Sequence, residues 1–502
     1  MPARMDEREA VELFRLLETK VKYEAEREAL ALRLKELDRK TREAQVEYGV
    51  ARNRYTRLLT LPTEVTCLIF QTALEHSLRR SNEGEGRDLL EVVVSHVCHQ
   101  WRTISLVYHP LWATFRYYGR GSSDLYLVLD RLDAYLERSA SHTLELSFDF
   151  RDAEFTLDHF DLLEKILRHA ARWRSLTILS DQNTLLGFID FLPRIEAISA
   201  PNLEYLTLCC NIAVTGHKTV TSLQPTIFTN GAPKLRGVRW NCSSSACLPP
   251  LSNITTLHLE ASKTTVFPFS WSAFLDILSL PYLATLSLAG DAFLFSTTMI
   301  PLIAMDNLKH LGFNNAGGMT LLLPHLRAPS LETLVIKDGY FRRELQMAAD
   351  PYVFPSLRSV SLIRTEAVSP NAAAQFARIT GSTTELLFLQ QDIHNTFIRA
   401  LDYLHSKDLW TKVKCVTCIF ERDNDITSLS LLNFAKAKFL RISSNMDVYW
   451  SQAYPQDYET LKKNCTISMM DLGDRVLLMH WPPGEHSFGH VQDDADPFAI
   501  EF

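Results

Sequence analysis

The clearest regularity along the chain is a run of alternating leucines that recurs from Ser141 onward. The copy at 201–208 reads Pro-Asn-Leu-Glu-Tyr-Leu-Thr-Leu, and similar copies stand at 233–240 and 281–288. Alternation at a period of two predicts short strands whose leucines point to one side of a sheet. Aligned copies begin at twelve places, 19 to 32 residues apart: 141, 173, 203, 235, 254, 283, 308, 331, 357, 384, 413 and 437.

The stretches between these runs, such as 160–167, carry apolar residues at helical spacing. One strand and one helix per unit resembles the leucine-rich-repeat plan, in which units stack into a solenoid. That resemblance implies an α/β fold with parallel strands on the concave side and helices on the outer side. The asparagine usual after the last leucine stands at Asn211 but is replaced at Asp291 and Gly339, so we expect irregular turns. A doubly wound α/β domain is the alternative, and the twelvefold recurrence of one pattern favours the solenoid.

Residues 5–58 carry the pattern of a long charged helix. Residues 1–60 contain 14 Lys/Arg and 12 Asp/Glu, with no glycine before Gly49. A second apolar column is interrupted by Lys20, Arg27 and Thr41. Two interpretations remain open: a coiled coil that would pair two copies of the chain, and a solvated single helix packed partly on the next domain. The unbroken column recurs every seventh residue, at Leu16, Tyr23, Leu30, Leu37, Ala44, Ala51 and Leu58.

The stretch from Leu61 to Trp112 predicts two short amphipathic helices. Pro62 suits the first helical position, and Glu64 complements the helix dipole in the first turn. The polar residues 81–88 form the intervening loop, and so small a unit needs a neighbour or partner to bury its apolar area. One apolar face is expected on each helix, with Val65, Leu68, Ile69 and Thr72 on the first and Val93, Val97, Trp101 and Ile104 on the second.

The order Leu-Pro-x-Glu, Ile-Phe, Val-Cys-x-x-Trp-Arg and Pro-Leu-Trp closely resembles the F-box. With the charged helix before it, the arrangement is similar to the large mushroom-type family of fungal F-box proteins. The insertion at 81–88 departs from the pattern, and a generic helical hairpin is the alternative. The resemblance implies contact with a Skp-type adaptor, although Trp101 could equally be internal core. The residues that match the contact positions are Leu61, Pro62, Glu64, Ile69, Phe70, Val97, Cys98 and Trp101.

This resemblance implies the substrate-receptor subunit of an SCF-type cullin–RING ubiquitin ligase, which reaches the cullin scaffold through the adaptor and itself makes no bond. The concave face of the repeats would then bind an unknown protein target. The alternative function is a non-catalytic scaffold that self-associates through residues 5–58 and binds a protein partner independently of ubiquitin. The strand positions expected to point away from the core, onto this concave face, and to contact the target are Tyr205, Arg239, His258 and Lys309.

Length and composition predict several domains. The 502 residues are 46% hydrophobic and carry a net charge of −7, so nucleic-acid binding is not expected. No apolar run is long enough for a membrane span, and the first residues lack a secretory signal, so we expect a cytoplasmic or nuclear location. The expected divisions are 1–58 for the charged helix, 59–118 for the F-box-like unit, 119–480 for the repeats and 481–502 for an acidic, disordered tail.

Motifs for catalysis and cofactor binding are absent from the sequence, and we expect neither an enzyme nor a cofactor. No phosphate-binding loop, nucleophile elbow, zinc-protease or dinucleotide motif occurs. The nine cysteines are scattered, which favours reduced thiols inside the cell. Cys415 and Cys418 form a lone C-x-x-C inside a predicted strand, where residues three apart point to opposite faces, so we expect no metal there.

Overall fold

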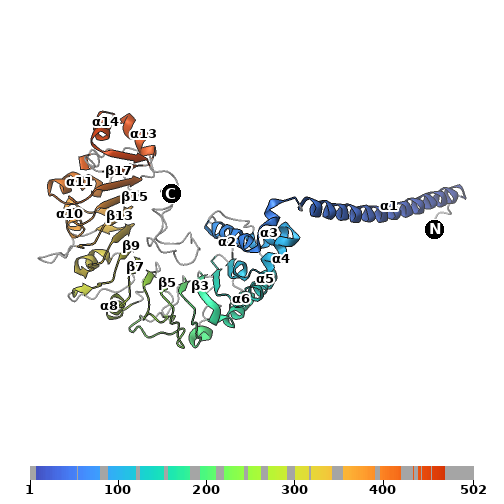
Figure 1. Cartoon of the computed structure of the whole chain (residues 1–502), viewed down its shortest axis with the longest axis horizontal. Coiled ribbons are helices and arrows are strands. Elements are labelled where there is room, and N and C mark those ends of the chain that lie inside the picture. The colour runs from blue at the N-terminus through green and yellow to red at the C-terminus, as the bar shows by residue number, and fades with distance from the viewer. Residues whose placement is uncertain are drawn as a thin grey trace, which may run out of the picture.

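The computed structural model shows a mixed α/β protein with a long N-terminal helix and a large parallel sheet (Figure 1). The predicted loop at 81–88, the tail at 481–502, Asn211 and Asp291 lie outside the described residues. The structure describes residues 7–53, 55–79, 89–119, 125–151, 157–180, 191, 193–210, 220–241, 247–261, 269–290, 300–315, 318–341, 354–389, 396–419, 433–434, 439–442, 444–453 and 455–469.

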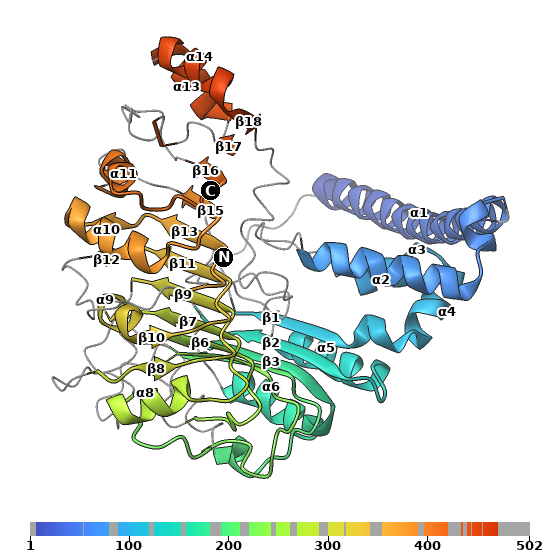
Figure 2. The same cartoon turned by 60° about the vertical axis from the view of Figure 1, so that its left-hand side comes forward.

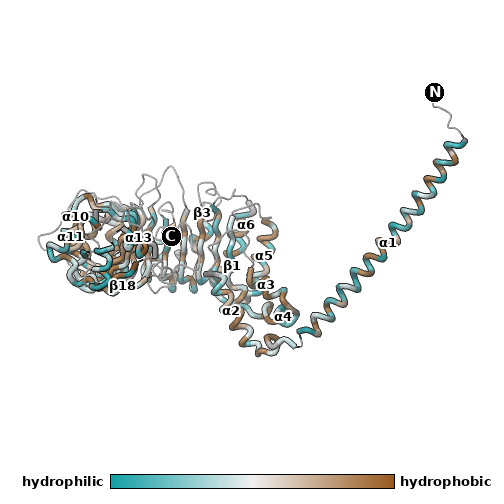
Figure 3. The backbone as a smooth tube through the Cα atoms, turned by 90° about the horizontal axis from the view of Figure 1, so that it is seen from above, coloured by the Kyte–Doolittle hydropathy of each residue, from teal (hydrophilic) through white to brown (hydrophobic). Residues whose placement is uncertain are grey.

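The long helix α1 spans Glu7–Asn53 and extends away from the rest of the molecule (Figures 1 and 3). Its 47 residues correspond to about 70 Å at 1.5 Å per residue. Charged pairs one turn apart support it, as where Arg39 contacts Glu36 at 2.7 Å. Nearly all of its side chains are exposed, so α1 is a solvated helix that does not pack on the other described elements.

A small helical unit follows α1, made of η1 (Arg57–Thr60), α2 (Thr63–Arg79), α3 (Leu90–Val97), α4 (His99–Val107) and η2 (His109–Trp112). The single helix expected across 93–104 is wrong, because the chain breaks at Cys98. Cys98 is extended at φ −158° and ψ 168°, and its Sγ accepts a hydrogen bond from the Trp101 amide at 3.4 Å. This sulfur caps the first turn of α4, as an N-cap side chain does. Pro62 lies just before α2 rather than at its first position.

Among the described residues, the large sheet has 14 parallel strands, and each strand pairs with the next strand of that sheet along the chain. This order differs from a doubly wound sheet, in which the strand order reverses. The two-residue strands β8 (Ile303–Ala304), β10 (Leu326–Arg327), β12 (Tyr340–Phe341) and β14 (Glu366–Ala367) form separate pairs, β8 with β10 and β12 with β14. The strands of the large sheet are β1 (Thr114–Tyr118), β2 (Leu144–Asp149), β3 (Trp173–Ser180), β4 (Tyr205–Cys210), β5 (Gly237–Asn241), β6 (Thr256–Glu260), β7 (Thr285–Ala289), β9 (His310–Asn314), β11 (Thr333–Lys337), β13 (Ser359–Ile363), β15 (Glu385–Leu389), β16 (Cys415–Ile419), β17 (Phe439–Ile442) and β18 (Thr466–Met469).

The sheet curves into an arc with helices on its outer side (Figures 1 and 2). Every second residue of each strand points toward these helices, and together these residues form one continuous core, as Leu206 and Leu208 do in β4. The residues between them point the other way and line the inner face of the arc. Among the helices and short helical turns between the described strands are α5 (Leu125–Arg138), α6 (Leu157–Leu167), η3 (Ala170–Arg172), α8 (Trp271–Leu278), α9 (Met319–Leu322), η6 (Leu323–His325), α10 (Pro370–Ile379), α11 (Thr396–Ser406), α13 (Ser444–Ala453) and α14 (Pro455–Asn464).

The turns after β7, β9, β11 and β13 are regular, so the expectation of irregular turns is wrong there. The residue after each strand is left-handed: Gly290 at φ 69°, Asn315 at 46°, Asp338 at 51° and Arg364 at 46°. Each of these amides donates to the last carbonyl of the next strand in the sheet, as Asp338 does to Ile363 at 2.9 Å. These hydrogen bonds from one turn to the next strand satisfy the turn amides without the expected asparagine.

Candidate functional site

The helical unit between α1 and the sheet packs around buried side chains that belong to the same hydrophobic core as the sheet. Phe70 on α2 is 1% exposed and meets the Trp101 ring of α4 edge-on, with ring centroids 5.1 Å apart. Val94 of α3 and Ile104 of α4 are buried with them. The side of α2 that carries Thr66 and Phe70 therefore faces inward, and these residues hold the three helices together.

The opposite side of α2 is apolar and exposed. Val65, Leu68 and Ile69 follow one another at i, i+3 and i+4, and their exposed fractions are 40, 62 and 38%. On α3, which contacts α2, Val93 and Val97 are exposed to 42 and 55%. Exposed apolar side chains on two helices that contact each other are typical of a docking surface. We name these five residues the apolar docking face.

Contacts with α5 and β1 join the helical unit to the sheet. Tyr135 of α5 donates a short hydrogen bond to the Glu91 carboxylate of α3, which is 6% exposed. Burial raises the pKa of Glu91, and the hydrogen bond from Tyr135 opposes that rise. Trp112 packs edge-on against Tyr135 at 5.3 Å and lies under the Arg138 guanidinium at 4.4 Å. The apolar docking face is therefore carried on a unit that is packed against the first strand of the sheet.

The residues expected to contact an adaptor divide into two groups in the structure. Phe70 is wrong as a surface contact, because it is buried in the centre of the helical unit, and the half-buried Trp101 packs against it. Cys98 is half-buried and caps α4, which explains its position structurally. The remaining residues of that set lie at least partly on the surface: Leu61 half-buried, and Pro62, Glu64, Ile69 and Val97 exposed.

Sequence reasoning missed the buried carboxylate of Glu91 and its partner Tyr135. A signal was present, because Glu91 is a lone carboxylate in the otherwise apolar stretch Leu89-Leu90-Glu91-Val92-Val93-Val94. A charge on such a helix is either at the surface or paired in the interior. The sequence does not show that its partner comes from α5, since 44 residues separate the two side chains.

The four residues expected at the target surface do not share one environment. Tyr205, Arg239 and His258 do point away from the core, on the inner face of the arc. Arg239 and His258 are 7 and 5% exposed, so the expectation of open side chains is wrong for both. Lys309 is wrong as an inner-face residue, because it precedes β9 and lies exposed at the amino edge of the sheet.

A polar group on β5 and β6 consists of the buried Arg239 and His258 and the half-buried Glu260. The Arg239 guanidinium makes a short ion pair with Glu260, and Arg239 lies directly opposite His258 in the strand register. Burial, with a smaller contribution from the charge of Arg239, lowers the pKa of His258 to about 3. His258 is therefore neutral at physiological pH and sits beside a paired arginine.

The inner face carries an apolar patch on four of its later strands, with polar residues on both sides of it, such as His258 on β6 and Arg441 on β17. β11, β13, β15 and β16 carry a second hydrophobic cluster, separate from the main core. A sheet face with both polar and apolar regions offers two kinds of contact along its length. The members of the apolar cluster are Val335, Ile363, Leu387, Leu389 and Ile419.

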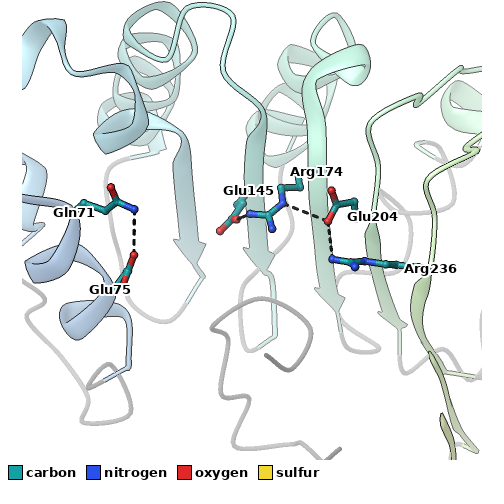
Figure 4. A network of polar contacts seen from close by, with 6 residues as sticks. All are labelled: Gln71, Glu75, Glu145, Arg174, Glu204 and Arg236. Carbon is teal, nitrogen blue, oxygen red and sulfur yellow. Dashed lines mark hydrogen bonds and ion pairs between the residues drawn. The ribbon is translucent and has the colours of Figure 1, made fainter. Parts of the chain in front are cut away.

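Charged residues cross the amino edge of the first strands in alternating sign (Figure 4). Arg174 donates to Glu145 at 2.9 Å and to Glu204 at 3.4 Å, and Arg236 donates to Glu204 at 2.9 Å. The Arg236 guanidinium also lies 4.8 Å from the Tyr205 ring centroid. We name these residues the charged edge. Lys309 takes the same position farther along, where its amide continues the same series of backbone bonds.

The described residues offer little for metal or redox chemistry. Cys415 and Cys418 lie on opposite faces of β16, as predicted, and Cys418 belongs to the main core. Burial raises the pKa of the Cys418 thiol, which disfavours the thiolate needed for metal binding. Within the described ranges no three His, Cys, Asp or Glu side chains gather to hold a metal ion. No helix in that part of the chain has the length and apolarity needed to span a bilayer.

Comparison with known proteins gives no family for the chain: no protein-family model matches the sequence, and no curated protein matches it.

Proposed function

We propose that the chain is a non-catalytic substrate receptor of an SCF-type cullin–RING ubiquitin ligase. Its helical unit would act as the F-box and bind a Skp-type adaptor, through which the cullin scaffold is reached. The observation that carries the proposal is the apolar docking face on the very helices that resemble the F-box in sequence. The receptor would form and break no bond, and its effect would be to hold a target beside the catalytic partner of the ligase.

The energetics of the docking face support this role. Leu68 is 62% exposed and Ile69 38%, while Phe70 beside them is buried and holds α2 in place. A rigid helix that presents exposed apolar side chains gains free energy when a partner removes them from water. In such an interface a few buried anchors carry most of the binding free energy. We assign that part to Val65, Leu68 and Ile69.

The sheet would act as a leucine-rich-repeat solenoid that holds the target. The strand order and the repeated leucines that point from the strands into the core support a solenoid. Among the four residues expected to bind the target, Tyr205 is partly exposed and Lys309 is exposed. Both adjoin the amino edge of the sheet. The charged edge is therefore the surface we assign to the target, which would be a protein with charges of both signs.

Co-purification with a recombinant Skp-type adaptor tests the proposal. The full chain is expected to retain the adaptor through size-exclusion chromatography, and Leu68→Asp is expected to lose it. The matched control is Leu127→Asp on α5, whose leucine is 67% exposed and lies outside the docking face. A folded full chain that retains no adaptor would overturn the ligase function.

A scaffold that self-associates through α1 and works independently of ubiquitin is the second candidate. The exposure of α1 along its whole length favours it. The two functions differ in one measurement, because only the receptor needs the apolar docking face to bind an adaptor. A chain that captures a protein partner normally when Leu68 is replaced by Asp, and never binds an adaptor, would be such a scaffold.

A further inference from the structure

The helix α1 exposes far more apolar surface than a solitary helix in water usually does. Its apolar side chains are 48 to 69% exposed, among them Leu16, Leu30, Leu34 and Leu37. Figure 3 shows apolar residues along the whole of this helix, which stands apart from the sheet. Most helices obtain their stability by burying an apolar face against a neighbour. The described part of the chain supplies no such neighbour for α1.

The seven-residue pattern selects one side of α1. We label positions a to g so that Leu34 is at a and Leu37 at d. Between residues 13 and 53 the d column is free of charged residues, whereas each of the other six columns contains at least one. The d column consists of Leu16, Tyr23, Leu30, Leu37, Ala44 and Ala51.

The charged residues of α1 divide according to the same pattern. Arg39, at position f, contacts Glu36 and Glu43, which are both at position c on the side away from the d column. The charges that flank the apolar side are different: Arg33 and Glu47 at position g, and Asp38 and Arg52 at position e, have no ion-pair partner among the described residues. These four charges flank the seam formed by the a and d columns and are available to a partner. Glu12, Glu24 and Lys40 also flank the seam but pair within α1, with Arg15, Lys20 and Glu36.

We propose that α1 pairs with α1 of a second copy of this chain in a parallel two-stranded coiled coil. In a parallel pair, position g of one helix faces position e of the next heptad on the other helix. Arg33 then faces Asp38 of the second copy, and Glu47 faces Arg52 of the second copy. Both contacts are attractive, and each occurs twice by symmetry.

The remaining flanking contacts are compatible with this register. Glu12 faces Leu17, Thr19 faces Glu24, Glu26 faces Ala31 and Lys40 faces Gln45, so no like charges meet at the flanks. Leucine at d is compatible with two strands, and a polar residue at a specifies the oligomeric state at a cost in stability. In α1 the polar residues at position a are Lys20, Arg27 and Thr41. The pairing joins two complete receptors through a segment that is separate from the docking face and from the sheet.

Light scattering on the full chain across a range of concentrations tests the pairing. The wild type is expected to have the mass of two chains at about 50 µM and to dissociate on dilution. Replacing Leu30 and Leu37 by Glu is expected to raise the dissociation constant about 100-fold or more, because it buries charges in the seam. The matched control replaces Leu32 and Val46 by Glu, since both are at position f and are 69 and 65% exposed. This control is expected to keep the mass of two chains.

Two results would overturn the pairing: a wild type that has the mass of one chain at every concentration, and a position-f control that dissociates as readily as the seam variant. Circular dichroism confirms in each case that α1 is still helical, so that loss of the helix is not mistaken for loss of the pair.

A charge reversal tests the parallel direction. Arg33→Glu is expected to weaken the pair, because the new carboxylate faces Asp38 of the second copy. Adding Asp38→Arg is expected to restore the wild-type dissociation constant. In an antiparallel pair Arg33 and Asp38 do not face each other, so failure of the second substitution to restore pairing would overturn the parallel arrangement.

Discussion

Tyr135 on α5 donates its hydroxyl to the buried carboxylate of Glu91 on α3. This contact crosses the boundary between the helical unit and the sheet. Burial raises the pKa of both groups. The hydrogen bond lowers the pKa of Glu91, whereas the Glu91 carboxylate raises the pKa of Tyr135 further, so the tyrosine stays protonated and donates to the carboxylate. The pair therefore fixes the direction in which the apolar docking face points relative to the strands.

Tyr135→Phe tests the importance of this contact for stability. The substitution removes the donor and leaves the Glu91 carboxyl buried, so we expect a loss of about 1–3 kcal/mol in the free energy of unfolding. Urea denaturation measures the loss. Tyr282→Phe is the control, because Tyr282 is 60% exposed before β7. Equal stability of the two variants would mean that the Glu91 contact contributes nothing to the fold.

Ile69→Asp separates binding from folding on the docking face. Ile69 is 38% exposed and packs less into the centre of the unit than Phe70 does, so the variant is expected to unfold like the wild type. Its affinity for a Skp-type adaptor is expected to fall by about 2 kcal/mol or more, the range of a central anchor. Titration calorimetry measures that affinity. An unchanged affinity would show that the adaptor does not use this side of α2.

Phe70→Ala is expected to act on stability. Phe70 is buried against Trp101, so the substitution leaves a cavity and is expected to lower the free energy of unfolding by about 3–5 kcal/mol. The comparison is Phe14→Ala on α1, where the ring is 67% exposed and the expected change is within about 0.5 kcal/mol. A Phe70→Ala chain with wild-type stability would place this side chain outside the core.

The buried His258 predicts a loss of stability in mild acid. Its pKa is about 3 in the folded chain and near 6.5 in the unfolded chain, so the unfolded state takes up a proton first as the pH falls. The contribution is complete above pH 6.5 and decreases from there toward pH 3. At pH 5 the expected loss is about 2 kcal/mol. His258→Gln is expected to flatten the dependence of the melting temperature on pH, whereas His76→Gln on the exposed side of α2 retains the wild-type slope.

The sequence allowed the strands to be predicted well, because the alternation of leucines is a local property. Leu206 and Leu208 lie in the core, and the parallel strands follow the chain in order, as the repeated pattern indicated. The long charged helix was predicted for 5–58 and spans Glu7–Asn53. Periodicity is sufficient for such elements because each residue's position depends on its near neighbours in the chain.

The errors have tertiary causes. Val97-Cys98-His99 contains neither proline nor glycine, so the break before α4 had no signal in the sequence, and the Cys98 sulfur that caps it acts through the folded backbone. Alternation shows that Arg239 and His258 leave the core but does not show that they are buried again on the inner face. Whether an apolar residue of α2 faces inward, as Phe70 does, depends on α4, which lies far along the chain.

The order of strands in the large sheet has a consequence for how the chain is made. Each strand pairs with the strand before it, so its partner has already left the ribosome when it emerges. The helical unit and β1 come first and supply the edge on which β2 can form. The sheet can therefore grow during synthesis without waiting for distant segments, and the apolar docking face would be complete while most of the strands are still untranslated.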